Sequence, residues 1–374
     1  MLASWLLVLG TPQSICGQTS VDSGPQPPLS ELVAKLREQN GLIGLAAMVT
    51  IDGKVIDSAV DGLRLKGREV PLDIKDRWHL GSITKSITAT MIARLVESGK
   101  MQWTDSVGDY FQDAVIHDDW KNVTLRQLLT HTSGAPSNFS FLVLLKRPAL
   151  GSQCTLARRQ AVMGIIKAKP SNPPGEKFVY SNVGYTIVGA MAEKATGEAW
   201  EDLIKREVFE PLGLKGAGFG PPRSSADTLQ QPRGHVSPLG FKIGVDDQAD
   251  NTPIMGPAGT AHMTLEDLCT FATEHARGHA GEGLLLSAET YQLLHRPELE
   301  EYACGWVRKP LPDGLPSVYW HNGSNTMWYA LVLFIPEKKT VIAVVSNDGD
   351  IAKAETAAWK VVKAKVPAEL ANQF

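Results

Sequence analysis

Apolar residues recur every three or four positions in two stretches of the chain, a spacing that places them on one face of an α-helix. The first stretch, 30–39, ends before Gly41 and predicts a short amphipathic helix. The second, 82–99, is the strongest helical pattern and ends on Gly99, where glycine commonly terminates a helix. Its apolar stripe consists of Ile83, Ile87, Met91, Ile92, Leu95 and Val96.

Runs rich in β-branched and aromatic residues predict strands near both ends of the chain. Asp52-Gly53 separates two such runs, 45–51 and 54–59, and is typical of a tight hairpin. Further strands are expected over 302–307, 317–321, 329–335 and 340–346, with a turn at 336–339. Helices are expected over 124–129, 184–195 and 351–366.

These elements place β-rich ends around an α-rich middle. If the two ends pair in one sheet, residues 29–81 and 253–374 form a discontinuous sheet domain, and 82–252 form a mainly helical domain. A chain of 374 residues is long enough for this arrangement.

The first residues predict export rather than a membrane span. An apolar run, 2–10, is followed by small and polar residues, so 1–20 resembles a signal peptide. The run is too short to cross a bilayer. Residues 21–28 are polar with Pro and Gly, and predict a linker. We expect a periplasmic or extracellular protein.

The composition of the chain argues against several classes of protein. The net charge is -3 and no Lys/Arg-rich block occurs, which argues against a nucleic-acid partner and favours a small one. The cysteines form no C-x-x-C pair, which argues against zinc-ribbon and thioredoxin-like sites. Three of the four are expected to be small buried side chains: Cys154, Cys269 and Cys304.

Candidate chemistry begins with Ser82 and Lys85, at the start of the strong helix. Residues three apart share a helix face, so the hydroxyl and the amine can meet. A serine hydroxyl needs a base, and lysine can serve only if its pKa falls from about 10.4 through burial or neighbouring cations. The pair alone is weak evidence, because a helix-capping serine beside a solvated lysine has the same spacing.

Two further motifs strengthen the hypothesis. Tyr180 and Asn182 form the only Tyr-x-Asn in the chain; such a phenol can relay protons, and such an amide can hold the lysine or a substrate carbonyl. His321-Asn322-Gly323 ends a predicted strand, where Gly323 would leave room for an acyl group. The N–H of Ser324 and the helix N-terminus could then donate to an oxyanion.

With these three motifs in order, the chain resembles the β-lactamase-related serine hydrolases, which include class C β-lactamases, D-Ala-D-Ala carboxypeptidases, D-aminopeptidases and family VIII esterases. Supporting frames include Leu128–Gly134, Pro211–Leu214 and Gly256–Gly259. The resemblance covers roughly 29–365 and implies an α+β fold, an antiparallel sheet flanked by helices beside an all-α domain. It also implies that Ser82 is the nucleophile, with Lys85 and Tyr180 sharing the role of base.

The third motif departs from the Lys-Thr-Gly of relatives that bind penicillins or peptide C-termini. His321 is a weaker anchor for a carboxylate than lysine, because histidine is mostly neutral at pH 7. We therefore expect a hydrolase of small-molecule esters, amides or short peptides, an esterase or D-amino acid peptidase with weak β-lactamase activity at most. The alternatives are an efficient class C-like β-lactamase and a non-catalytic penicillin-binding or scaffold relative.

Other candidate residues favour structural roles. His275 and His279 could share a metal, but no third ligand has a suitable spacing, so a solvated helix face is expected and no metal or other cofactor is predicted. The chain lacks H-E-x-x-H and G-x-S-x-G, which argues against zincins and α/β-hydrolases. The remaining candidates are expected to pack in the interior: His131, Tyr185, Trp78 and Trp306.

Overall fold

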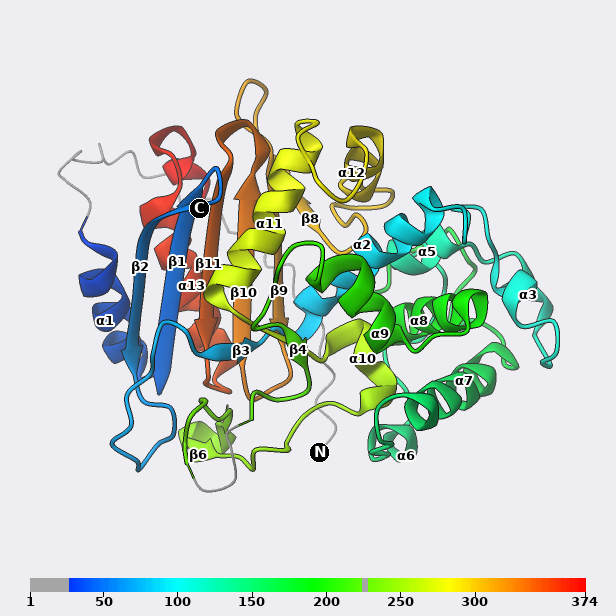
Figure 1. Cartoon of the computed structure of the whole chain (residues 1–374), viewed down its shortest axis with the longest axis horizontal. Coiled ribbons are helices and arrows are strands. Elements are labelled where there is room, and N and C mark those ends of the chain that lie inside the picture. The colour runs from blue at the N-terminus through cyan, green and yellow to red at the C-terminus, as the bar shows by residue number, and fades with distance from the viewer. Residues whose placement is uncertain (1–26, 224–227) are drawn as a thin grey trace.

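A computed structural model describes residues 27–223 and 228–374, and its centre is a six-stranded antiparallel sheet (Figure 1). The strand order is β2-β1-β11-β10-β9-β8. Strands from the two ends of the chain meet where Ala46 pairs with Val345. The predicted joining of the chain ends in one sheet is therefore confirmed. The strands are β1 (Gly44–Ile51), β2 (Lys54–Gly62), β8 (Val307–Lys309), β9 (Val318–Ser324), β10 (Tyr329–Ile335) and β11 (Thr340–Ser346).

Helices cover both faces of the sheet. α1 (Leu29–Asn40) and α13 (Ile351–Lys365) pack on one face, and α11 (Leu265–His279) packs on the other (Figure 1). Successive side chains of a strand point to opposite faces, so Leu331 joins the core on the α1 side and Val332 joins the core on the α11 side. Burial on both faces explains why β10 and β11 are nearly continuous apolar runs.

A helical region lies beside the sheet and surrounds α2 (Thr84–Glu97), which follows the short turn η1 (Gly81–Ile83). Every residue of α2 from Thr84 to Ala93 is buried. This burial fits a helix that packs on α8, α9 and α10 as well as on β-sheet residues around its start. The neighbouring helices are α3 (Val107–Tyr110), α4 (Asp118–Lys121), α5 (Leu125–Leu129), α6 (Phe141–Leu144), α7 (Ser152–Ile166), α8 (Asn182–Thr196), α9 (Trp200–Ile204) and α10 (Gly256–Gly259).

The remaining elements are short and connect these layers. β3 (Arg77–His79), β7 (Ala261–Thr264) and β4 (Gly218–Phe219) form a small sheet, and β5 (His235–Val236) pairs with β6 (Ile243–Gly244). The others are α12 (Ala288–Leu294), η2 (Lys205–Phe209), η3 (Pro238–Gly240), η4 (Pro253–Met255), η5 (Pro336–Lys338) and η6 (Ala368–Gln373). The α+β class is confirmed, whereas the two domain boundaries stay a prediction.

Most predicted elements are present, with one clear error. The hairpin turn forms at Asp52 and Gly53, both with positive φ (51° and 74°). The strand expected over 302–307 is wrong, because regular pairing begins only at Val307. Gly305 has φ 78° and lies against the backbone of Ser86, which takes this segment out of an extended conformation.

The described residues do not test the N-terminal predictions. The signal peptide, most of the linker and Cys16 lie outside them. Within the described ranges, none of the helices combines the length and the apolar character needed to cross a bilayer. The other three cysteines are buried free thiols, as expected.

Candidate active site

Gly81 determines how Ser82 is presented at the start of α2. Its φ of +50° is a conformation that glycine adopts easily, and a Cβ there would lie 2.3 Å from the backbone nitrogen of Ser324. The Gly81 N–H donates to His79 Nδ1 at 3.1 Å, and the Gly81 carbonyl accepts from the Thr84 hydroxyl at 2.7 Å. Ser82 is thus held on a short turn that only a glycine can precede.

Gly323 brings β9 against this turn. A Cβ at Gly323 would lie 2.1 Å from the Leu80 carbonyl oxygen and 2.5 Å from the Ser82 nitrogen. The glycine is therefore required for contact between two segments of the chain itself. That Gly323 also leaves room for the acyl group of a substrate stays a prediction. The oxyanion role of the Ser324 N–H also stays a prediction, although the Ser324 nitrogen lies close to Gly81.

Lys85 is fully buried and its amine contacts three oxygen atoms. Nζ lies 3.0 Å from Ser82 Oγ, 2.7 Å from Asn182 Oδ1 and 2.8 Å from the Ala258 carbonyl oxygen. Burial holds the pKa of Lys85 well below its ordinary value. A neutral amine can donate to the two carbonyl oxygens, which can only accept, and its lone pair then remains for the Ser82 hydroxyl.

The ring of Tyr180 packs next to the amine of Lys85. Lys85 Nζ lies 4.7 Å from the centre of the Tyr180 ring. Burial raises the pKa of Tyr180 well above its ordinary value, and the Ser82 side chain only partly opposes this shift. The phenol oxygen is buried and makes no hydrogen bond of ordinary geometry within the described chain. A protonated phenol at this place can pass a proton on more readily than it can remove one.

His131 positions the tyrosine motif. Its pKa is well below the ordinary value because the ring is buried, so Nδ1 is free to accept the Ser181 N–H at 3.1 Å. The ring also packs 4.3 Å from that of Tyr180. Ser181 in turn caps α8 by accepting the Gly184 N–H at 2.9 Å. These contacts support the expected structural role of His131.

Asn182 links the amine to a second loop. Its Oδ1 accepts from Lys85, and its Nδ2 donates to Asn138 Oδ1 at 2.7 Å. Both ends of the amide are thereby occupied, which fixes its orientation. Asn182 therefore holds Lys85 in place, which is one of the two roles expected of it.

His321 is buried beside the same cluster and has no free nitrogen. Nδ1 lies 2.5 Å from the Asn322 carbonyl oxygen, which can only accept, so Nδ1 carries the proton and Nε2 accepts from the Tyr302 hydroxyl at 3.1 Å. Burial, assisted by Lys85, lowers the pKa of His321 to about 3. The ring is thus neutral, and both of its polar atoms are used within the protein.

Comparison with known proteins assigns the chain to a family. The family model described as Beta-lactamase matches residues 29–365. The chain belongs to the β-lactamase family. The chain is 28% identical over 329 residues to penicillin-binding protein 4 of Amycolatopsis lactamdurans, covering 84% of this chain and 83% of that protein. It spans 52% and 63% of the length of the next two curated relatives.

Solved structures support the same fold for this β-lactamase family member. The octameric penicillin-binding protein homologue from Pyrococcus abyssi matches with a TM-score of 0.73 at 23% identity, over 89% of this chain and 75% of that one. The D-amino acid amidase from Ochrobactrum anthropi matches with a TM-score of 0.72 at 18% identity, over 90% and 97%. At these identities the likeness concerns the fold.

Two residues close to the Ser82 turn, His79 and Asp250, were not predicted to be part of the site. His79 Nε2 lies 2.9 Å from Asp250 Oδ1, an oxygen that accepts a hydrogen bond from Asn325 Nδ2 at 2.9 Å. Through Nδ1, the same ring accepts the Gly81 N–H. No local sequence pattern could predict the contact between His79 and Asp250, because the two residues are far apart in the chain. The three-residue spacing between His79 and Ser82 is the one feature that could have drawn attention to the histidine.

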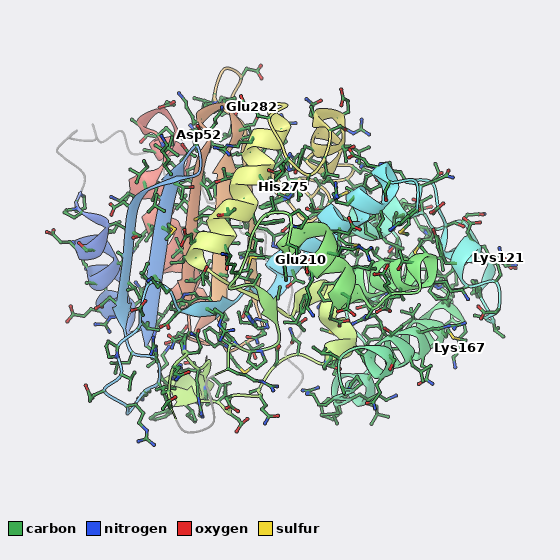
Figure 2. The ribbon with its side chains drawn as sticks, in the orientation of Figure 1. Asp52, Lys121, Lys167, Glu210, His275 and Glu282 are labelled. Carbon is green, nitrogen blue, oxygen red and sulfur yellow. The ribbon has the colours of Figure 1, made fainter. Side chains whose placement is uncertain are left out.

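The histidine pair on α11 is not a solvated face, which corrects the prediction. His275 of α11 is labelled in Figure 2 and is fully buried. Its ring lies 6.1 Å from that of Phe334 in the sheet, and its Nδ1 lies 2.9 Å from His295 Nε2. His279 is half-buried and contacts His295 at 3.0 Å. Within the part of the chain that the structure describes, no group of such side chains is arranged to hold a metal.

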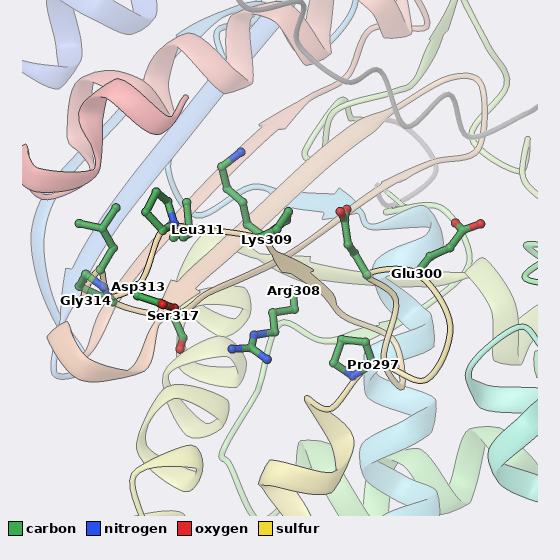
Figure 3. Close-up of a pocket in the computed structure, with 13 residues that line it drawn as sticks. Pro297, Glu300, Arg308, Lys309, Leu311, Asp313, Gly314 and Ser317 are labelled. Carbon is green, nitrogen blue, oxygen red and sulfur yellow. The ribbon is translucent and has the colours of Figure 1, made fainter.

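A hollow of about 310 Å³ lies elsewhere, beside β8 and the loop that follows it (Figure 3). Its lining mixes acidic and basic side chains, among them Glu300, Arg308 and Lys309. Neither Ser82 nor Lys85 lines it. This hollow is therefore separate from the candidate active site.

Proposed function

We propose that this β-lactamase family member is a serine hydrolase that forms an acyl-enzyme on Ser82. The observation that carries the proposal is the environment of Lys85, whose amine is buried and touches two carbonyl oxygens and the Ser82 hydroxyl. Only the hydroxyl among these three can donate a proton to the amine. This arrangement is what a serine–lysine pair needs for nucleophilic catalysis.

The reaction would proceed in two stages. Lys85 takes the Ser82 proton as Oγ attacks the substrate carbonyl, and the Ser82 and Ser324 N–H groups stabilise the oxyanion. Tyr180, which is protonated before the reaction, passes its proton to the leaving group and regains one from Lys85. Water then attacks the acyl-enzyme with the same groups acting in the reverse direction, and this step releases the acid.

The surroundings of His321 support a substrate class. A neutral imidazole with both nitrogens in use offers no charge to a substrate carboxylate. Esters and amides without a carboxylate beside the scissile bond are therefore favoured, such as short acyl esters and D-amino acid amides. The D-amino acid amidase among the structural neighbours is consistent with this proposal.

The deciding experiment is a comparison of substrates together with active-site labelling. A fluorophosphonate probe is expected to modify Ser82, as located by mass spectrometry. A panel of 4-nitrophenyl esters, D-amino acid amides, D-Ala-D-Ala peptides and nitrocefin then separates the substrate classes. Absence of labelling and turnover would favour a scaffold protein, and fast nitrocefin hydrolysis would favour an efficient β-lactamase.

Export is part of the proposal and rests on the apolar run 2–10. N-terminal sequencing of the protein recovered from its native source tests it. A mature N-terminus near residue 20 is expected, and an intact Met1 would contradict it.

A further inference from the structure

Large apolar side chains are exposed at several places on the described chain, and two of the segments that carry them are considered together. The first comprises α6 and the loop after it, where Phe141, Leu142 and Leu145 are 63%, 75% and 56% exposed. The second is the turn between β5 and β6, where Leu239 and Phe241 are 97% and 70% exposed. Leu239 also has a positive φ of 50°, which non-glycine residues rarely adopt. We call these two segments the apolar tips.

The apolar tips lie on one edge of the molecule. α6 and β6 both lie at the lower edge in Figure 1, on either side of the chain that leads to α10. Clustered exposed side chains of this size are uncommon on a protein surface without an interaction partner.

Both tips are connected to segments that surround Ser82. Next to the first tip, Asn138 accepts from Asn182, which holds Lys85, and the Lys146 carbonyl accepts from the Thr252 hydroxyl at 2.6 Å. At the second tip, the His235 N–H donates to the Met327 carbonyl at 3.1 Å, just after β9. A surface bound to the tips would therefore lie close to the candidate active site.

The charge around the first tip is positive. No Asp or Glu occurs between Asp119 and Glu176, although the whole chain carries a net charge of -3. Lys146 and Arg147 follow Leu145 directly and are exposed, and neither forms an ion pair with a carboxylate within the described residues. Lys121 and Lys167 lie farther along the helical side (Figure 2), so the positive charge at the tip comes from Lys146 and Arg147.

From these observations we propose that the apolar tips dock on the surface of an anionic phospholipid bilayer, with the candidate active site nearby. Exposed Leu and Phe side chains next to basic residues match the interfacial region, where apolar groups enter the acyl boundary and basic groups meet anionic headgroups. A fluid apolar layer can accept two separated groups of apolar side chains without a fixed shape that matches both. The proposal does not depend on the reaction at Ser82.

Vesicle flotation tests the docking. The full chain is mixed with phosphatidylcholine vesicles that contain phosphatidylglycerol, or with phosphatidylcholine alone. The tip variant combines Phe141→Ser, Leu142→Ser, Leu239→Ser and Phe241→Ser. The matched control combines Val115→Ser and Leu284→Ser, which are 80% and 71% exposed and lie before α4 and between α11 and α12, away from the tips.

Wild type and the control are expected to float with the anionic vesicles, and the tip variant is expected to bind at least about 10-fold more weakly. A Lys146→Gln/Arg147→Gln variant should lose the preference for anionic vesicles. Circular dichroism and turnover of a water-soluble ester should be unchanged in all variants, because none alters the catalytic cluster. Equal flotation of tip variant and control, or no flotation of wild type, overturns the proposal. Tip-dependent self-association in sedimentation velocity without vesicle binding would also overturn it, since the occupant would then be a second copy of the chain.

Discussion

Of the three oxygen atoms within hydrogen-bond distance of Lys85 Nζ in the described chain, the one on Ser82 belongs to a group that can also donate. The separation of 3.0 Å is within the range over which the hydroxyl can donate its proton to the amine lone pair. Burial lowers the pKa of Lys85, which favours the neutral amine and so the lone pair that accepts the proton.

Replacement of the nucleophile is the first prediction. Ser82→Ala is expected to lower kcat on 4-nitrophenyl butyrate by at least about 1,000-fold, because no other described group is placed to form the acyl-enzyme. Ser86→Ala serves as a control on the same helix: its hydroxyl only donates to the Ile83 carbonyl. Wild-type turnover in Ser82→Ala would disprove the assignment of the nucleophile.

The pH dependence distinguishes Lys85 from Tyr180 as base. If neutral Lys85 is the base, kcat/KM falls as the pH drops through its lowered pKa and is level above it. If the phenolate of Tyr180 were the base, its raised pKa would make the rate climb through the alkaline range. Rates measured between about pH 5 and 10 are expected to show the first form. A continuous alkaline rise would assign the base to Tyr180.

A conversion of His321 tests the substrate preference. His321 is neutral across the assay range because burial lowers its pKa to about 3. His321→Lys supplies an amine whose charged form a bound carboxylate would stabilise. Use of substrates with a carboxylate should improve relative to neutral esters, as measured by the ratio of kcat/KM values. An unchanged ratio would show that residue 321 does not face the acid group of the substrate.

The close approach of β9 to the Ser82 turn predicts a large effect of a single methyl group. Gly323→Ala places Cβ 2.1 Å from the Leu80 carbonyl oxygen, so β9 must move away from Ser82. A displacement near 1 Å costs about 100-fold in rate. Gly164→Ala is the control, because that glycine lies in α7 with no neighbour near its Cβ position. It should retain activity and keep or raise the Tm, since alanine is favoured in helices by about 1 kcal/mol.

His79 is predicted to act as a positioning residue. His79→Ala removes the acceptor of the Gly81 N–H and leaves Asp250 without its ring partner. We expect kcat to fall about 10- to 100-fold with little change in KM, because the turn that carries Ser82 loosens. His79→Asn offers another acceptor and should restore part of kcat. Equal losses in Ala and Asn variants, each matched by a lower Tm, would indicate a merely structural role.

Local sequence patterns predicted helices, strands and turns correctly where hydrophobic periodicity or turn chemistry alone decided the structure. The 82–99 stripe, the Asp52-Gly53 turn and the apolar runs of β10 and β11 all follow from periodicity or turn chemistry. The 302–307 strand failed because Gly305 serves a contact with α2, a tertiary demand that β propensity does not include.

The candidate site was predictable only in part, because some of its contacts join residues that are distant in the sequence. Ser82, Lys85, Tyr180 and His321 belong to ordered motifs, and the structure brings their side chains into one buried cluster. Asp250 belongs to no motif, because its pairing with His79 is a contact between distant parts of the chain. His275 was wrongly placed in solvent because helical spacing does not reveal that this turn of α11 faces His295 inside the protein.

The pairing of β1 with β11 has a consequence for biosynthesis. β1 is the first strand of the sheet to be made and its partner β11 is the last, so one edge of the β1–β2 hairpin stays unpaired until β11 has left the ribosome. That edge is apolar and could pair with other chains during the delay. We therefore expect that the nascent chain depends on a holding chaperone, and that the nucleophile becomes competent only after the final strand has docked.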